Sequence, residues 1–343
     1  MNFPIGREIA TASLISAAFV LSGCGGGSSV PPGPDRVSAG AMAASPAAFV
    51  CLTKSCLYVA NFYGNAITVY QSTAKGNVKP LHAISGSKTG LAGPYDIALD
   101  SSHNAYVANT NGGSASTGSV TVYAAAANGN VAPVRTITGS NTSLFYPFGI
   151  ALDSKKNAYV TNYNGQSITV YAPGAKGNVA PIRTIAGSST GLFYPIGIAL
   201  GATGKIYVAN SSAPSLTVYA AGANGSVTPI QTISGSNTGL NGPQGIALGS
   251  AGKIYVANFG GSVTVYRSNA NGNVAPLQTI AGSKTGLNQP FGIAVKGSAL
   301  YVANEAAYTV TVYPANANGN VAPTATLGGS NTGLDGPAGI IVH

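Results

Sequence analysis

A unit of about 48 residues recurs six times along this chain, and a repeat of that length constrains the architecture before any single residue is considered. Its clearest marker is a short segment that begins with Tyr and ends with Asn, written YVAN or YVTN. The six copies begin at Tyr58, Tyr106, Tyr159, Tyr207, Tyr255 and Tyr301. Repeats of this length are typical of β-propellers, in which each repeat supplies one blade.

Each unit contains four short segments with the composition of strands. After YVAN comes a segment ending in TVY, then a turn that usually reads NGN or KGN, then a segment such as PIRTIAG at residues 181–187. A loop of the type GSxTGL leads to the fourth segment, P-x-G-I-A-L, which begins for example at Pro147 and Pro195. The pattern predicts an all-β fold, a six-bladed β-propeller with four-stranded antiparallel blades.

Side-chain alternation and turn chemistry support this prediction. In residues 254–258, IYVAN, alternate side chains point to opposite faces, and both sets are apolar or aromatic. Both faces should therefore be buried, as packing of blade on blade requires. Asn-Gly pairs such as Asn128-Gly129 fall between strands, and we expect type I′ hairpin turns there because Asn and Gly tolerate positive φ.

The strand that begins with Pro occurs once more than the other three. Its seven copies begin at Pro46, Pro94, Pro147, Pro195, Pro243, Pro290 and Pro337. We expect the last copy, residues 339–342, to return to the first blade and close the ring, because closure leaves no unpaired strand edge. Residues 49–52 would then share that blade or be displaced from it.

Composition argues for an ordered protein and against binding to nucleic acid. Only 7% of the 343 residues are charged, whereas 45% are hydrophobic. The net charge of +9 comes from basic residues scattered over the turns of different repeats, such as Lys75, Lys176 and Lys284. Recognition of nucleic acid usually needs a clustered basic stripe, so we expect no nucleic-acid partner. We also expect the protein to be a monomer.

The first residues have the pattern of an export signal. An apolar run from Ile9 to Val20 follows Arg7, and the sequence Leu-Ser-Gly-Cys24 comes directly after this run. The run is shorter than the roughly 20 residues of a membrane-spanning helix. The LSGC sequence resembles a bacterial lipobox, which implies that residues 1–23 are a lipoprotein signal peptide and that Cys24 carries the lipid. An ordinary cleaved signal without lipid is the alternative.

Residues 24–45 are rich in Gly, Pro, Ala and Ser, and we expect them to form a flexible tether before a propeller that spans residues 46–343. The expected location is the bacterial cell envelope, where a lipid anchor holds the protein on a membrane. Gly25 stands where inner-membrane lipoproteins commonly carry Asp, so we expect the outer membrane if the source has two membranes.

Cys51 and Cys56 flank a short turn, residues 52–55. An exported chain favours paired cysteines, and we expect a disulfide between them. The alternative, a metal site, would need further Cys or His residues nearby, and we expect His82 and His103 to lie in other units.

The YVAN or YVTN strand, the GIAL strand and the turn between them resemble the NHL and YVTN-type β-propeller repeats of exported bacterial proteins. The resemblance covers residues 46–343 and implies the propeller fold. It does not imply one function, because related propellers include binding modules, lactonases and lyases.

Function must therefore be predicted from positions that differ between repeats. Loops before the innermost strands and after the second strands share one face of a propeller, which we call the loop face, and there the repeats diverge. The residues that we expect to bind a ligand there are Phe62, Tyr63, Tyr95, Asp96, Phe148, Tyr163, Gln244, Phe259, Phe291 and Glu305. Aromatic side chains supply contact area, so the first hypothesis is a non-enzymatic binding or scaffolding module with a protein, peptide or glycan ligand.

Asp96 and Glu305 motivate the alternative hypothesis. Asp96 stands where other repeats carry Gly, and Glu305 follows the Asn that ends the sixth YVAN strand. With the repeated Asn side chains, these acids could hold a divalent cation such as calcium in a lactonase-like hydrolase or lyase. The shared position of the Asn residues instead favours a structural role in turns. We therefore expect no cofactor, no metal and no catalytic residue.

Overall fold

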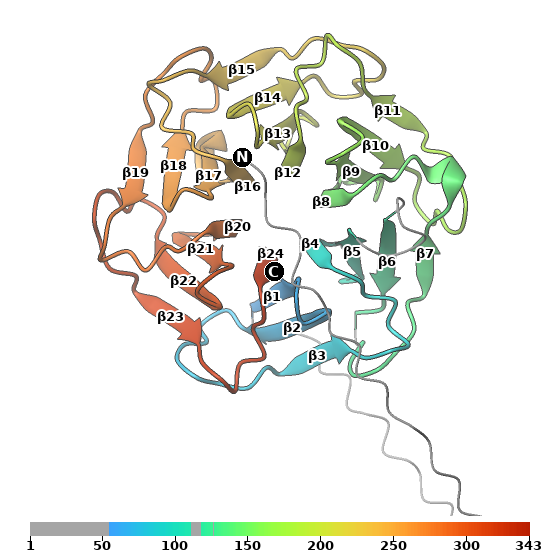
Figure 1. Ribbon diagram of the computed structural model, residues 1–343, viewed down its shortest axis with the longest axis horizontal. Coiled ribbons are helices and arrows are strands. Elements are labelled where there is room, and N and C mark those ends of the chain that lie inside the picture. The colour runs from blue at the N-terminus through green and yellow to red at the C-terminus, as the bar shows by residue number, and fades with distance from the viewer. Residues whose placement is uncertain (1–54, 111–117, 126) are drawn as a thin grey trace, which may run out of the picture. The chain divides into compact units, whose positions relative to one another are not determined.

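The computed structural model describes residues 55–110, 118–125 and 127–343, which all belong to the unit Ala48–His343. Six four-stranded antiparallel sheets surround a common centre, so the prediction of a six-bladed propeller is confirmed (Figure 1). The expected signal peptide, the lipid-bearing Cys24, the tether and Cys51 lie outside the described residues. No helix in the described ranges is both long enough and apolar enough to span a membrane.

Every blade uses its four strands in the same order from the centre outwards. The innermost strands are β24 (Pro337–Val342), β4 (Pro94–Leu99), β8 (Pro147–Leu152), β12 (Pro195–Leu200), β16 (Pro243–Leu248) and β20 (Pro290–Lys296). The second strands are β1 (Cys56–Asn61), β5 (Ala105–Asn109), β9 (Ala158–Asn162), β13 (Ile206–Asn210), β17 (Ile254–Asn258) and β21 (Ala299–Asn304).

The outer half of each blade repeats just as regularly. The third strands are β2 (Ala66–Gln71), β6 (Ser119–Tyr123), β10 (Ser167–Tyr171), β14 (Ser215–Tyr219), β18 (Ser262–Tyr266) and β22 (Thr309–Pro314). The outermost strands are β3 (His82–Ser85), β7 (Arg135–Ile137), β11 (Arg183–Ile185), β15 (Gln231–Ser234), β19 (Gln278–Ala281) and β23 (Ala325–Gly328). Two short 3-10 turns, Ser140–Thr142 and Ser250–Gly252, complete the described elements.

The ring closes through the C-terminal strand, as expected from the surplus copy. β24 pairs antiparallel with β1, with Leu57 opposite Val342 and Val59 opposite Ile340. It occupies the innermost place of the first blade (Figure 1). Residues 49–52, the other strand considered for that place, lie outside the described residues.

Apolar clusters lie between neighbouring blades, because the middle strands present buried side chains on both faces. Val170 of β10 and Val208 of β13, for example, are fully buried and belong to one cluster that joins the third and fourth blades. The same arrangement recurs around the ring. The sequence expectation that both faces are buried is therefore confirmed.

The Tyr that ends each TVY segment joins neighbouring blades through a hydrogen bond. The buried Tyr123 hydroxyl donates to the carbonyl of Thr89 in the preceding GSxTGL loop at 2.6 Å, and Tyr219 donates in the same way to Thr190 at 2.6 Å. All six TVY tyrosines make this bond. A buried hydroxyl without a partner would be costly, so the repeated loop carbonyl satisfies it.

The Asn that ends each second strand is fully buried and hydrogen bonded. Asn162 Nδ2 donates to Thr169 Oγ1 at 3.0 Å, and its Oδ1 accepts from the Phe145 N–H at 3.2 Å. The other five repeats use the same side chain in the same way. The structural role predicted for these Asn residues is confirmed, and they do not line the loop face.

The Asn-Gly pairs do not form the hairpin turns expected from the sequence. Gly129 has φ 75° but Asn128 has no positive φ, so the pair does not form a type I′ turn. Instead it contacts the preceding blade, where Asn128 Oδ1 accepts from the Ala83 N–H at 3.2 Å and the Gly129 N–H donates to the Ala83 carbonyl at 2.7 Å. Equivalent bridges of the turn Gly to the outermost strand occur at all six interfaces between neighbouring blades, which we call seams. We call this contact the rim clasp.

Candidate functional site

Six aromatic side chains gather where the innermost strands begin. They are Phe62, Tyr95, Phe148, Tyr163, Phe259 and Phe291, and they pack around Ile196 and Ala338. Each lies either directly after the Pro that begins an innermost strand or directly after the Asn that ends a second strand. The fold thus converges residues that are far apart in sequence into one group, which we call the aromatic cluster.

Tyr95 is at the centre of this cluster. Its ring centroid lies 4.9 Å from that of Phe62, 4.0 Å from that of Phe148 and 4.8 Å from that of Phe291. The rings of Phe148 and Tyr163 stack at 4.8 Å. Aromatic pairs at these separations attract each other, so the cluster is a packed surface with fixed geometry.

Two residues expected to bind ligand lie below the surface. Phe291 is 5% exposed and Gln244 is fully buried. Gln244 Nε2 donates to Ser211 Oγ at 3.3 Å, whereas its Oε1 has no hydrogen-bond partner among the described residues. These side chains support the loop face from beneath, and a ligand on the surface would contact the partly exposed rings above them.

Tyr63, which is exposed, and Glu305, which is half-buried, form a polar pair on the loop face. The Tyr63 hydroxyl donates to Glu305 Oε1 at 2.9 Å, and the Tyr63 side chain is 54% exposed. Burial raises the pKa of the Glu305 carboxyl, although the hydrogen bond from Tyr63 opposes this. Burial and the same hydrogen bond raise the pKa of Tyr63 to about 12. Burial and, secondarily, the charge of Glu305 raise the pKa of Tyr95 well above its usual value, which places Glu305 near the cluster.

A cavity of about 350 Å³ runs between the six innermost strands. Tyr95, Phe148 and Phe291 line it where the strands begin. A half-buried aliphatic ring lines it where the strands end, formed by Leu99, Leu152, Leu200, Leu248, Val295 and Val342. The cavity and the aromatic cluster therefore share one boundary.

Asp96 is the only charged side chain that lines this cavity in the described part of the chain. Its Oδ1 accepts from the Ile97 N–H at 2.9 Å and its Oδ2 accepts from the Ile150 N–H in the next blade at 3.0 Å. Burial raises the pKa of Asp96 to about 7, although these two backbone hydrogen bonds oppose the effect. The carboxyl group is therefore divided between its two protonation states near neutral pH.

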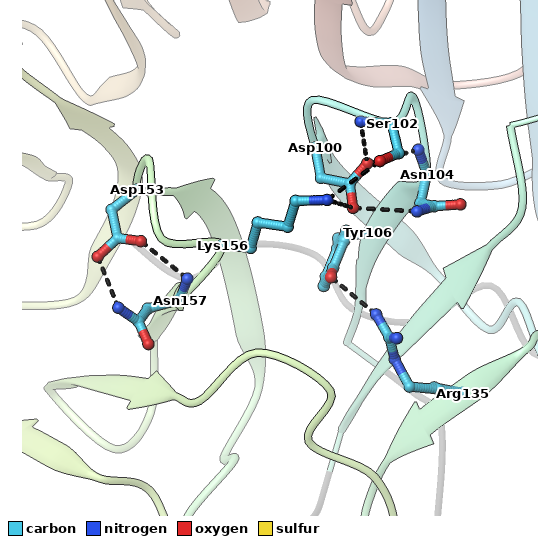
Figure 2. A network of polar contacts seen from close by, with 8 residues as sticks. All are labelled: Asp100, Ser102, Asn104, Tyr106, Arg135, Asp153, Lys156 and Asn157. Atoms are coloured by element: carbon cyan, nitrogen blue, oxygen red, sulfur yellow. Dashed lines mark hydrogen bonds and ion pairs between the residues drawn. The ribbon is translucent and has the colours of Figure 1, made fainter.

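The opposite end of the second and third blades carries a different polar network (Figure 2). Asp100 accepts hydrogen bonds from the Ser102 and Asn104 N–H groups and pairs with Lys156 of the next blade at 3.3 Å. Burial alone would raise the pKa of Asp100, but these hydrogen bonds outweigh it and the pKa is lowered. Asp153 makes the equivalent bonds to its own loop. These acids hold tight turns, and their acceptor atoms are occupied.

The oxygen ligands proposed for a cation are not gathered at one place. The Asn oxygens accept hydrogen bonds from backbone N–H groups, as described above for Asn162. In the described ranges no group of three or more His, Cys, Asp or Glu side chains could hold a metal ion. Asp96 binds backbone of the next blade, whereas Glu305 binds Tyr63. Cys56 is disulfide-bonded, and its expected partner Cys51 lies outside the described residues.

One feature of the site was not predicted from the sequence, namely the hydrogen bond between Ser211 and Gln244. Ser211 follows the Asn of its repeat, where other repeats carry Phe62, Tyr163 or Phe259. Polar residues therefore replace aromatic ones at both variable positions of the same seam. That coincidence is the signal that could have revealed the pair.

Comparisons with known proteins show the fold. No protein-family model and no curated protein matches the chain. A chain in the crystal structure of a nidogen/laminin complex is 14% identical, with a TM-score of 0.59 over 84% of this chain and 98% of that chain. A protein of unknown function from Bacteroides caccae is 11% identical, with a TM-score of 0.60 over 84% of this chain and 99% of that one.

A third similar structure is that of an enzyme. Streptogramin B lyase is 14% identical, with a TM-score of 0.55 over 83% of this chain and 82% of that chain. Neighbours at this level of identity include both binding and catalytic proteins, so they establish the propeller and leave function to the site itself.

Proposed function

We propose that this propeller is a non-enzymatic binding or scaffolding module of the bacterial cell envelope, anchored through a lipid on Cys24. The observation that carries the proposal is the aromatic cluster, which is assembled from non-repeated residues at one end of a repeated framework. Aromatic side chains with a nearby polar group are typical of the centres of protein interfaces.

The ligand that fits this face best is a peptide segment of another protein. Partly exposed rings such as Phe62 and Tyr163 offer flat apolar contacts, and Glu305 offers an acceptor beside them. The similar chain in the nidogen/laminin structure comes from a protein–protein complex, which is consistent with a propeller in this role. A glycan that stacks on the same rings is the other outcome of the test.

A lactonase-like hydrolase or lyase has less support. It would need a cation at the centre of the ring, and the Asn oxygens that could have bound one already accept backbone hydrogen bonds. The three His residues, His82, His103 and His343, lie outside the aromatic cluster. General acid–base chemistry would then rest on Asp96 and Glu305 alone.

The proposal can be tested with peptides selected from a random display library against the mature protein, alongside a glycan array. Peptides or glycans that occupy the loop face should lose affinity about ten-fold or more in Phe259→Ala or Glu305→Gln. Ile182→Ser, which changes a side chain that is 54% exposed on the outer rim, is the matched control and should bind normally. Binders that respond to Ile182→Ser and ignore both loop-face variants would contradict the proposal.

A further inference from the structure

Asp96 occupies a position where the fold otherwise requires glycine. The equivalent residues in the next four blades are Gly149, Gly197, Gly245 and Gly292. A Cβ added at these positions would lie between 2.1 and 2.4 Å from the carbonyl oxygen of the next innermost strand. Such a contact would force the strands apart, so the seam between β4 and β8 differs from these four in having room for a side chain.

A carboxyl group is a costly choice for that seam if its role is only structural. The two backbone N–H groups that it binds leave part of its acceptor capacity unused, because a carboxylate has about four lone-pair sites. Its remaining surroundings in the cavity are aliphatic and aromatic side chains and glycines. A carboxylate in such surroundings is destabilised unless a positive group accompanies it.

We propose that the central cavity binds a small aliphatic ammonium ion, with its nitrogen on the Asp96 carboxylate and its hydrocarbon part against the aliphatic lining. Three features of the cavity fit this class of ligand. Asp96 supplies the only charge among the described residues that line the cavity, and Tyr95, Phe148 and Phe291 supply aromatic rings beside it, which attract cations. Leu200, Leu248 and the other aliphatic residues line the remainder.

The volume and the chemistry also argue against other ligands. About 350 Å³ lies at the lower end of the range for small-molecule sites, which excludes a folded partner. A hard metal ion would need about six oxygen ligands, and Asp96 alone cannot supply them. Anions would meet a carboxylate in an apolar cavity and no compensating base.

The cavity shares Tyr95, Phe148 and Phe291 with the aromatic cluster, but the two proposals can be tested with different residues. Tyr63, Phe259 and Glu305 do not line the cavity, so variants of these residues should leave binding of the ammonium ion unchanged. The peptide experiment changes Phe259 and Glu305 and leaves Asp96 intact. The failure of one proposal therefore does not imply the failure of the other.

The test is isothermal titration calorimetry of the mature protein with three probes of similar size: n-butylammonium, 1-butanol and butyrate. We expect saturable binding of n-butylammonium, weaker binding of 1-butanol and no binding of butyrate. Asp96→Asn should weaken binding of n-butylammonium about ten-fold or more, because the charge-assisted hydrogen bond is lost, and should leave binding of 1-butanol nearly unchanged.

Two further measurements distinguish loss of the binding site from loss of the fold. Asp96→Gly reproduces the residue of the other blades, so it tests loss of the carboxyl group in a seam that the fold tolerates, and circular dichroism checks that both variants are folded. Comparison of the three probes on the wild-type protein needs no variant. Equal affinity for n-butylammonium and butyrate, no saturable binding of n-butylammonium, or equal affinity in wild type and both folded variants would overturn the proposal.

Discussion

Asp96 Oδ2 accepts a hydrogen bond of 3.0 Å from the backbone N–H of Ile150, so a carboxyl group joins the innermost strands of two blades. At the other described seams the residue aligned with Asp96 is glycine and contributes no side chain. The contact between these two innermost strands therefore depends on the protonation state of an acid, whereas the aligned glycines make no such contact.

The free energy of unfolding should depend on pH because the pKa of Asp96 is raised in the folded protein. Burial raises the pKa of Asp96 from 3.8 to about 7, so between these values the folded protein holds a proton that the unfolded chain has released. Stability from this group is thus greatest at low pH and is lost as pH rises through 7. The free energy of unfolding of the wild type should fall relative to Asp96→Gly by roughly 2 to 4 kcal/mol between pH 4 and pH 8.

Urea unfolding of both proteins across this range measures the difference. The neighbouring groups Asp100, His103 in the loop after β4 and His343 at the end of β24 are common to both proteins, so their contributions cancel. The other strands packed on β4, which are β1, β5 and β8, carry no acid or His. A constant difference between the two proteins at every pH would show that Asp96 is not perturbed.

The buried Asn residues should be more important for stability than their polarity suggests. Asn162→Ala would leave the Phe145 N–H and Thr169 Oγ1 without their partner inside the protein. We expect a loss of about 2 to 4 kcal/mol. Asn164→Ala changes an exposed Asn two residues away and should alter stability by less than about 0.5 kcal/mol. Thermal melts that give the two variants equal midpoints would refute the structural role.

Phe291 should behave as a core residue although its position varies between repeats. Its side chain is 5% exposed, and its ring centroid lies 4.8 Å from that of Tyr95. Phe291→Ala should therefore lower the free energy of unfolding by about 3 kcal/mol or more. Tyr255→Ala, at a repeated packing position that is 2% exposed, should cost about 3 to 5 kcal/mol. Phe259→Ala, at a partly exposed ring, should cost less than either. Urea unfolding ranks the three, and a Phe291→Ala protein as stable as Phe259→Ala would contradict this order.

The membrane anchor can be separated from the fold. Cys24→Ser should release the protein from the membrane fraction and leave its thermal midpoint unchanged, because the expected lipid lies outside the propeller. Fractionation of cells, followed by a melt of the released protein, measures both effects. Continued membrane association of the variant would mean that LSGC is not a lipidation site.

Most of the fold could be predicted because each strand pattern was repeated six times. The surplus Pro337 strand even predicted ring closure, since a count that differs by one has few physical explanations. The rim clasp could not be predicted in the same way. Asn128-Gly129 has the local chemistry of a hairpin turn, and its true partner, Ala83, belongs to another blade.

The candidate site could also be predicted only in part from the sequence. Sequence position placed Tyr95, Phe148 and Phe291 at one end of the ring, and the structure brings them together. Their depth could not be predicted, because it depends on how close the six strands approach at the centre. That approach is set by backbone contacts at glycines such as Gly197, whose added Cβ would lie 2.2 Å from a carbonyl oxygen.

The pairing of β24 with β1 has a consequence for how the chain could be rearranged. The Cys56 N–H donates to the His343 carbonyl at 2.9 Å, so the last residue lies beside the start of the first described strand. A short linker could join these two points, and new ends could be opened in any exposed loop between blades. The order of blades along the gene is therefore one of several orders that would give the same closed ring.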